Sequence, residues 1–74
     1  RELLSKFEAI SIGVRRGFYD EEILFDYIGF SVVAFYRATQ HYIENLRQSS
    51  LNKHLFINFE ALARRWESKE GYFK

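Results

Sequence analysis

Nucleophilic catalysis is the first chemistry to consider, because the chain has two histidines and several hydroxyl side chains. A nucleophile needs a base within hydrogen-bonding reach and a third group that orients the base. None of the hydroxyl residues stands in a glycine-framed turn, and both histidines fall on polar positions of predicted helices. We therefore expect solvated histidines and no enzyme. The residues considered are Ser5, Ser11, Ser31, Thr39, Ser49, Ser50, Ser68, His41 and His54.

Metal binding has slightly more support, because His41 and Glu44 stand three residues apart and would share a helix face. A zinc site needs about four ligands, and His54 is the only further histidine. Cysteine is absent, which excludes thiolate ligands and disulfides. No glycine-rich loop precedes a predicted helix, so the sequence offers no phosphate cradle either. We expect no metal and no cofactor.

Acidic residues cluster at Asp20, Glu21 and Glu22. Paired carboxylates can perform acid–base chemistry when burial separates their pKa values. Here Asp20 is a suitable N-cap, and the two glutamates place negative charge at the positive end of a helix dipole. We therefore interpret the cluster as the start of a helix.

Five basic residues form the candidate nucleic-acid surface, together with the glutamate predicted to neutralise part of it. We expect Glu60 to form a partly exposed ion pair with a basic residue of the first helix, worth about 0–1 kcal/mol. The first two helices resemble a helix-turn-helix, but the residues that would meet the bases are acidic. A net charge of +1 provides little attraction for phosphates, so we do not expect nucleic acid as a partner. The patch is Arg15, Arg16, Arg64, Arg65 and Lys69, and Glu60 would pair with Arg15 or Arg16.

Length limits the chain to one helical domain, residues 1–74, in which a small core requires dense packing or a partner. Aromatic residues make up 19% of the chain, and each buried ring removes a large apolar area from water. No apolar run reaches the roughly 20 residues that cross a bilayer, and no secretory signal pattern opens the chain. Because the first residue is Arg1, we expect a fragment of a longer chain.

The first predicted helix covers about residues 2–16, where apolar residues recur at four- and three-residue steps. Gly17 supplies a residue that turns left-handed at little cost after the helix end. Gly13, inside the helix, marks a close approach by a neighbour. The predicted buried stripe is Leu3, Leu4, Phe7, Ile10 and Val14.

The second predicted helix begins at the Asp20 cap and is apolar on nearly all sides until Gly29, which is expected to end or kink it. A helix of this kind is either central or covered by another chain. Phe25, Tyr27 and Phe30 are more rings than one small core can hold. We expect these three to contact a partner.

Two further segments complete the predicted fold. One covers about residues 31–48, with Arg47 on its solvated face, and the other begins at an Asn52 cap. Short connections predict an all-α, compact antiparallel bundle of three to four helices, three if the middle segments form one kinked rod. The predicted buried positions are Val32, Phe35, Tyr36, Thr39, Tyr42, Ile43 and Leu46, then Leu55, Phe59, Leu62, Ala63 and Trp66.

A family resemblance rests on stretches spread over nearly the whole chain. They are Phe7–Glu8 with Gly13 and Arg15–Gly17, the turn Tyr19–Glu22, then Tyr42, Ile43 and Arg47, and Asn58–Glu60 with Leu62, Ala63 and Trp66. On these residues the chain resembles a bacterial family, domain of unknown function 4760. The resemblance implies a small helical cytoplasmic domain that commonly follows one or two membrane-spanning helices. It implies no catalytic residues, and such helices are missing here.

Our leading functional expectation is a non-catalytic helical interaction module that self-associates, as a homodimer, or docks a partner protein. The plainer interpretation is that the rings simply fill the core. One alternative is the cytoplasmic sensor or adaptor domain of a membrane-tethered bacterial protein, and another is weak nucleic-acid binding. We expect a cytoplasmic location, at the inner face of the membrane only through a segment absent from this chain.

Overall fold

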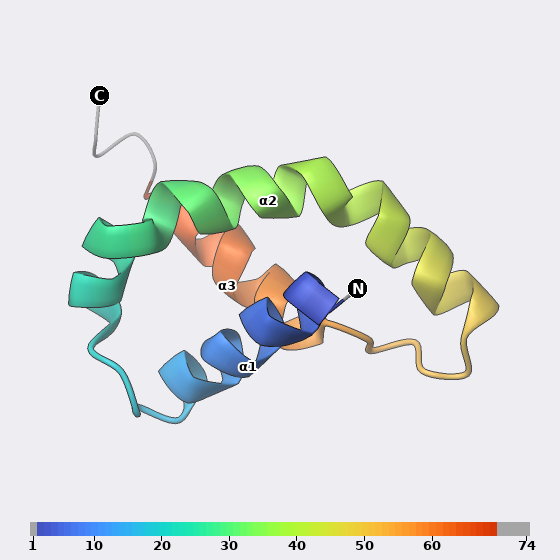
Figure 1. The fold of residues 1–74 in the computed structure, drawn as a ribbon, viewed down its shortest axis with the longest axis horizontal. Coiled ribbons are helices and arrows are strands. Elements are labelled where there is room, and N and C mark those ends of the chain that lie inside the picture. The colour runs from blue at the N-terminus through green and yellow to red at the C-terminus, as the bar shows by residue number, and fades with distance from the viewer. Residues whose placement is uncertain (1, 70–74) are drawn as a thin grey trace.

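The computed structural model describes residues 2–69, which form three helices. Helix α1 covers Glu2–Arg15, α2 covers Glu21–Ser49 and α3 covers Ile57–Glu67. The long helix α2 forms an arc across the molecule, and α1 and α3 lie on its concave side (Figure 1). The described residues contain no strand, so the predicted all-α class is confirmed in its three-helix form.

Gly29 does not end a helix, which corrects the predicted break between the two middle segments. Helix α2 continues through it for 29 residues without interruption. Gly29 is buried, and a Cβ built on it would lie 2.7 Å from Cδ1 of Phe25, one turn earlier. The missing side chain therefore makes room for the Phe25 ring. A glycine inside a helix can serve packing because the backbone hydrogen bonds need no Cβ.

The connection between α1 and α2 has the predicted ends. The Phe18 amide donates to the Gly13 carbonyl at 2.8 Å, and the Gly17 amide donates to Val14 at 3.0 Å. With Gly17 at φ +78°, these bonds form a Schellman motif. Asp20 then caps α2, because its Oδ1 accepts from the Ile23 amide at 3.1 Å. Gly13 meets a close neighbour as expected, since an added Cβ would collide with the exposed ring of Tyr19.

The start of α3 differs from prediction. Asn52 does not cap this helix; its Oδ1 accepts from the His54 amide at 2.9 Å within the preceding loop. The helix begins only at Ile57, after Phe56, which adopts a left-handed conformation at φ +61° and provides no side-chain cap. The ring of Phe56 is buried in the core, so packing holds the backbone in this unfavourable region.

The core is built around α3, which contacts both other helices. Phe59, Ala63 and Trp66 are completely buried, as predicted. In α1 the buried stripe is shifted by one residue, because Leu4 and Ser11 face the core while Leu3 is exposed. Tyr42, predicted to be buried, is half exposed. Within the described residues, no helix combines the length and hydrophobicity that crossing a membrane requires.

Candidate functional site

The hydroxyl groups considered for catalysis serve the helices in several cases. Ser11 Oγ donates to the Phe7 carbonyl at 2.7 Å, and Thr39 Oγ1 donates to Phe35 at 2.7 Å. His41 lies 4.0 Å from Glu44, with both side chains largely exposed. The described part of the chain contains no group of three or more metal-ligating side chains. These contacts are those of ordinary helix surfaces and interiors.

A polar network on Glu60 joins α3 to α2, which corrects the predicted pairing with α1. Tyr36 Oη donates to Glu60 Oε2 at 3.1 Å, Arg47 lies 3.0 Å from Oε1, and Arg64 lies 3.2 Å from Oε2. The predicted partners Arg15 and Arg16 belong to α1, which packs on a different side of α3. Glu60 faces α2, so it cannot meet them.

Electrostatics in this network favour a charged Glu60. Burial opposes ionisation, but the hydrogen bonds from Arg47 and Tyr36 and the nearby positive charges outweigh it, so the pKa of Glu60 lies below its ordinary value. For Tyr36, burial raises the pKa, and the Glu60 carboxylate acts in the same direction. The network therefore links α2 and α3 as a carboxylate held by charged and phenolic donors.

Arg47 is the member that sequence reasoning missed. It was placed on the solvated face of its helix, yet only 17% of its side chain is exposed. Its Nε donates to the Leu55 carbonyl at 2.8 Å, and its buried Nη2 has no hydrogen-bond partner. The helical pattern could not reveal this role, because both partners come from later in the chain.

Glu8 supplies the cap that α3 lacks. Its Oε1 accepts from the Phe59 amide at 2.7 Å, and its Oε2 accepts from Asn58 Nδ2 at 2.8 Å and the Asn58 amide at 3.4 Å. A carboxylate stabilises the amides at the positive end of a helix dipole. Phe7 beside it packs on Phe59, with ring centroids 5.4 Å apart. Two stretches that carry the family resemblance therefore contact each other directly.

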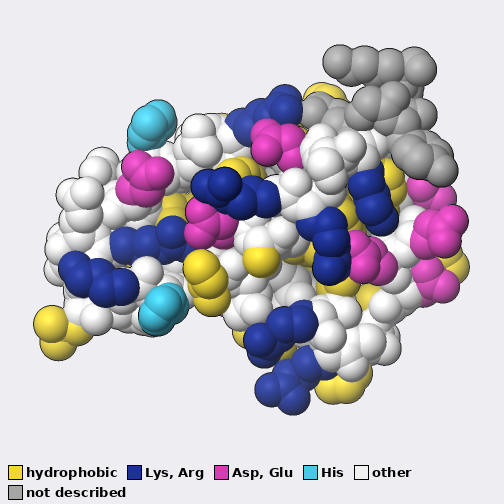
Figure 2. Space-filling model, turned by 180° about the vertical axis from the view of Figure 1, so that it is seen from behind, with side chains coloured by type: hydrophobic (Ala, Val, Ile, Leu, Met, Phe, Trp, Pro, Cys, Tyr) yellow, Lys and Arg dark blue, Asp and Glu magenta, His cyan; other side chains and the backbone are white. Residues whose placement is uncertain are grey.

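Glu21 performs a similar task at the other end of α3. Its Oε2 accepts from Trp66 Nε1 at 2.8 Å and lies 2.8 Å from Arg65 Nη2. Arg65 belongs to the predicted basic patch, as does Arg64, and both carry an intramolecular ion pair. Figure 2 shows Lys and Arg side chains lying beside Asp and Glu side chains on the rear face. The patch is therefore partly neutralised rather than a single positive surface.

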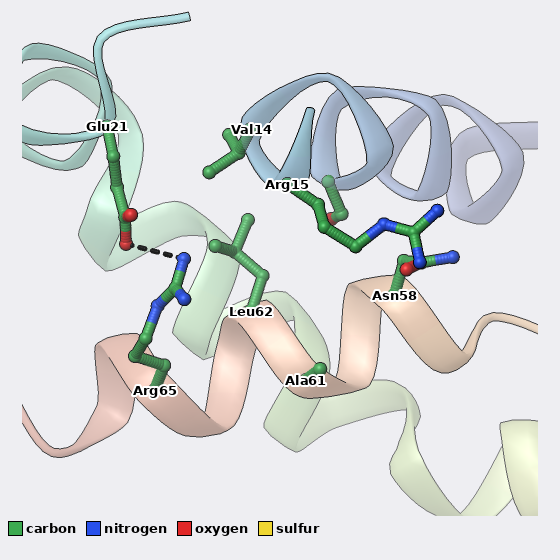
Figure 3. Close-up of a pocket in the computed structure, with 8 residues that line it drawn as sticks. Val14, Arg15, Glu21, Asn58, Ala61, Leu62 and Arg65 are labelled. Carbon is green, nitrogen blue, oxygen red and sulfur yellow. Dashed lines mark ion pairs between the residues drawn. The ribbon is translucent and has the colours of Figure 1, made fainter. Parts of the chain in front are cut away.

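A shallow pocket of about 340 Å³ lies between α1, α3 and the start of α2. Arg15 reaches from α1 toward Asn58, whereas Arg65 turns away to Glu21 (Figure 3). The two guanidinium groups therefore do not converge on one point. The lining residues are Ser11, Val14, Arg15, Glu21, Asn58, Ala61, Leu62 and Arg65.

The rings predicted to contact a partner separate into two groups. Phe25 is only 6% exposed and packs edge-on against Trp66 at 5.3 Å between centroids, so assigning it to a partner was wrong. Tyr27 and Phe30 are 85% and 73% exposed. Ile23, one turn before Tyr27, is 68% exposed on the same side of α2 and was not selected from the sequence. Its four-residue spacing from Tyr27 was the available signal.

These side chains belong to a continuous exposed face, which we call the outer face of α2. It lies opposite the buried residues of this helix and therefore on the convex side of the arc in Figure 1. Large apolar side chains occupy its first half, and alanines occupy its second half. One acidic and one basic residue lie along one edge. The outer face comprises Ile23, Asp26, Tyr27, Phe30, Ala34, Arg37, Ala38 and His41, all exposed.

Comparison with known proteins gives one match. The family described as Domain of unknown function (DUF4760) matches residues 1–66. No curated protein and no solved structure matches the chain. Because the matched residues include all of α1 and α2 and nearly all of α3, the chain belongs to the DUF4760 family.

Proposed function

We propose that this domain is a non-catalytic helical interaction module that binds protein, a second copy or another chain, through the outer face of α2. The observation that carries the proposal is the exposure of Ile23, Tyr27 and Phe30 on successive turns of one helix. Single exposed apolar residues are common on protein surfaces. Three on one face, at positions i, i+4 and i+7, form the pattern by which helices bind apolar partners.

Energetics support the same conclusion. Burying an apolar side chain of this size contributes about 1.5–3 kcal/mol. The core cannot take these residues, because it is already filled by Trp66, Phe59 and their neighbours with no exposed surface. The face is also preorganised, since α2 is continuous through Gly29. A rigid helix loses little conformational entropy when it binds.

A second form of the proposal places the same module in the cytoplasmic part of a membrane-tethered protein, where it acts as sensor or adaptor. Membership of the family supports it, because the resemblance implies that such domains commonly follow membrane-spanning helices. The natural protein should then sediment with membranes and resist extraction by high salt. Release by salt alone would contradict the tethered form and leave the interaction module intact.

Photo-crosslinking in the natural host tests the interaction module. A benzophenone amino acid at position 30 should give adducts of higher mass with protein. The matched control is position 51, because Leu51 is an equally apolar residue in the loop after α2 and is fully exposed. We expect adducts at position 30 and none at position 51. Absence of any protein adduct at position 30 would contradict the proposal.

A further inference from the structure

We infer that the partner on the outer face of α2 is a second copy of this chain, packed antiparallel about a twofold axis near residues 31–32. This inference rests on the proposed function and names its partner. Its first support is the distribution of side-chain size along the face. Ile23, Tyr27 and Phe30 occupy one half, while Ala34 and Ala38 occupy the other. Antiparallel pairing sets the large residues of each copy against the alanines of the other.

Complementary size matters because helices pack by inserting side chains of one into the spaces of the other. In the antiparallel arrangement, Tyr27 and Ile23 of one copy lie over the alanines of the second copy. A parallel arrangement would instead place Phe30 on Phe30 and alanine on alanine. That pairing crowds one half of the interface and leaves the other half empty, which packs poorly.

The second support is charge. Asp26 and Arg37 are eleven residues apart, about three turns at 3.6 residues per turn, so they lie along the same edge of the face. An axis midway between them places Asp26 of each copy beside Arg37 of the other. Isologous interfaces repeat each contact twice, so the dimer gains two such pairs. Arg37 already binds Glu67 at 2.7 Å, yet half of its side chain remains exposed.

The shape of α2 determines how strong this contact is. The face lies on the convex side of the arc (Figure 1), so two copies touch mainly at their middle turns, around Phe30. Ile23 to His41 would extend for about 27 Å along a straight helix at 1.5 Å per residue. A convex contact uses only the central part of that length. We therefore expect a reversible dimer that dissociates on dilution.

Charge reversal tests both the partner and the register. Light scattering across a dilution series should show monomer converting to dimer as concentration rises. Asp26→Arg or Arg37→Glu alone should raise the dissociation constant about tenfold, because two attractive pairs become repulsive. The double variant should recover most of the loss. Arg37→Glu also breaks the contact with Glu67, but the double variant carries the same loss, so their comparison isolates the contact between copies.

The matched control is Glu44→Arg, which makes the same charge change on the same helix beyond the paired turns and should leave the dissociation constant unchanged. Circular dichroism of each variant confirms that the helices are intact. A monomer at every concentration, or a double variant no better than the single ones, overturns the inference. Adducts at position 30 of mass other than two chains also overturn it, while the interaction module stands. No adducts at that position would remove both.

Discussion

At the scale of single residues, three carboxylates join the helices. Glu8 caps the start of α3, Glu60 binds α3 to α2, and Glu21 holds Trp66 and Arg65 near its end. Each carboxylate accepts from charged donors, from ring donors or from backbone amides that have no partner in their own helix. Hydrogen bonds to charged groups contribute more than neutral ones, which gives these residues a large share in orienting the helices.

Glu8→Gln should lower the free energy of unfolding by about 1–3 kcal/mol, because an amide replaces the charged acceptor at the start of α3. Chemical denaturation measures the change. Glu44→Gln is the control, since that side chain is well exposed and should change the stability by no more than about 0.5 kcal/mol. Equal stability of the two variants would show that Glu8 contributes nothing as a cap.

Acid should weaken the domain through Glu60. Its pKa is lower in the folded chain than its ordinary value of 4.5, so the unfolded chain binds more protons in that range. The stabilisation is therefore complete above pH 4.5 and is lost as the pH falls through the folded pKa. Denaturation at a series of pH values should show this loss in the parent and a smaller slope in Glu60→Gln. An unchanged slope in that variant would exclude Glu60 as the source.

At the scale of elements, Gly29 shows how packing overrides a local signal. Gly29→Ala should gain about 1 kcal/mol of helix propensity. However, its Cβ would push the buried Phe25 ring, and such overpacking costs about 1–3 kcal/mol. We expect a net loss of stability in thermal melting. Gly13→Ala is the matched control, because the Tyr19 ring it meets is half exposed and can turn away at little cost. A more stable Gly29→Ala domain would contradict this account.

The sequence predicted those parts of the elements that depend on neighbouring residues. Asp20 and Gly17 end their helices by contacts within a few positions, and both were identified. Gly29 was interpreted as a break because its partner, the Phe25 ring, is not visible in a local pattern. The cap from Glu8 and the buried Arg47 join residues far apart in the chain, so helical periodicity could not reveal them. The late start of α3 follows from burial of Phe56, which is a property of the whole core.

The same distinction applies to the candidate site. The sequence gave an excess of rings over core volume, and Tyr27 and Phe30 are indeed exposed. It could not tell which rings the core would choose, because Phe25 is selected by its contact with Trp66. Ile23 was missed for the opposite reason, since an aliphatic residue in the first turn is equally suited to a core. The outer face therefore emerged only when the three helices were assembled.

At the scale of the whole molecule, stability depends on few side chains, because a chain of 74 residues has a small core. Trp66 is completely buried, packs on Phe25 and donates to Glu21. Trp66→Ala should cost about 3–5 kcal/mol, which is comparable to the total stability of a small domain. The variant should show no cooperative thermal transition by circular dichroism. Phe30→Ala is the control, because it removes an exposed ring and should leave the melting of dilute protein unchanged. A Trp66→Ala domain that melts like the parent would mean that the core is not centred on α3.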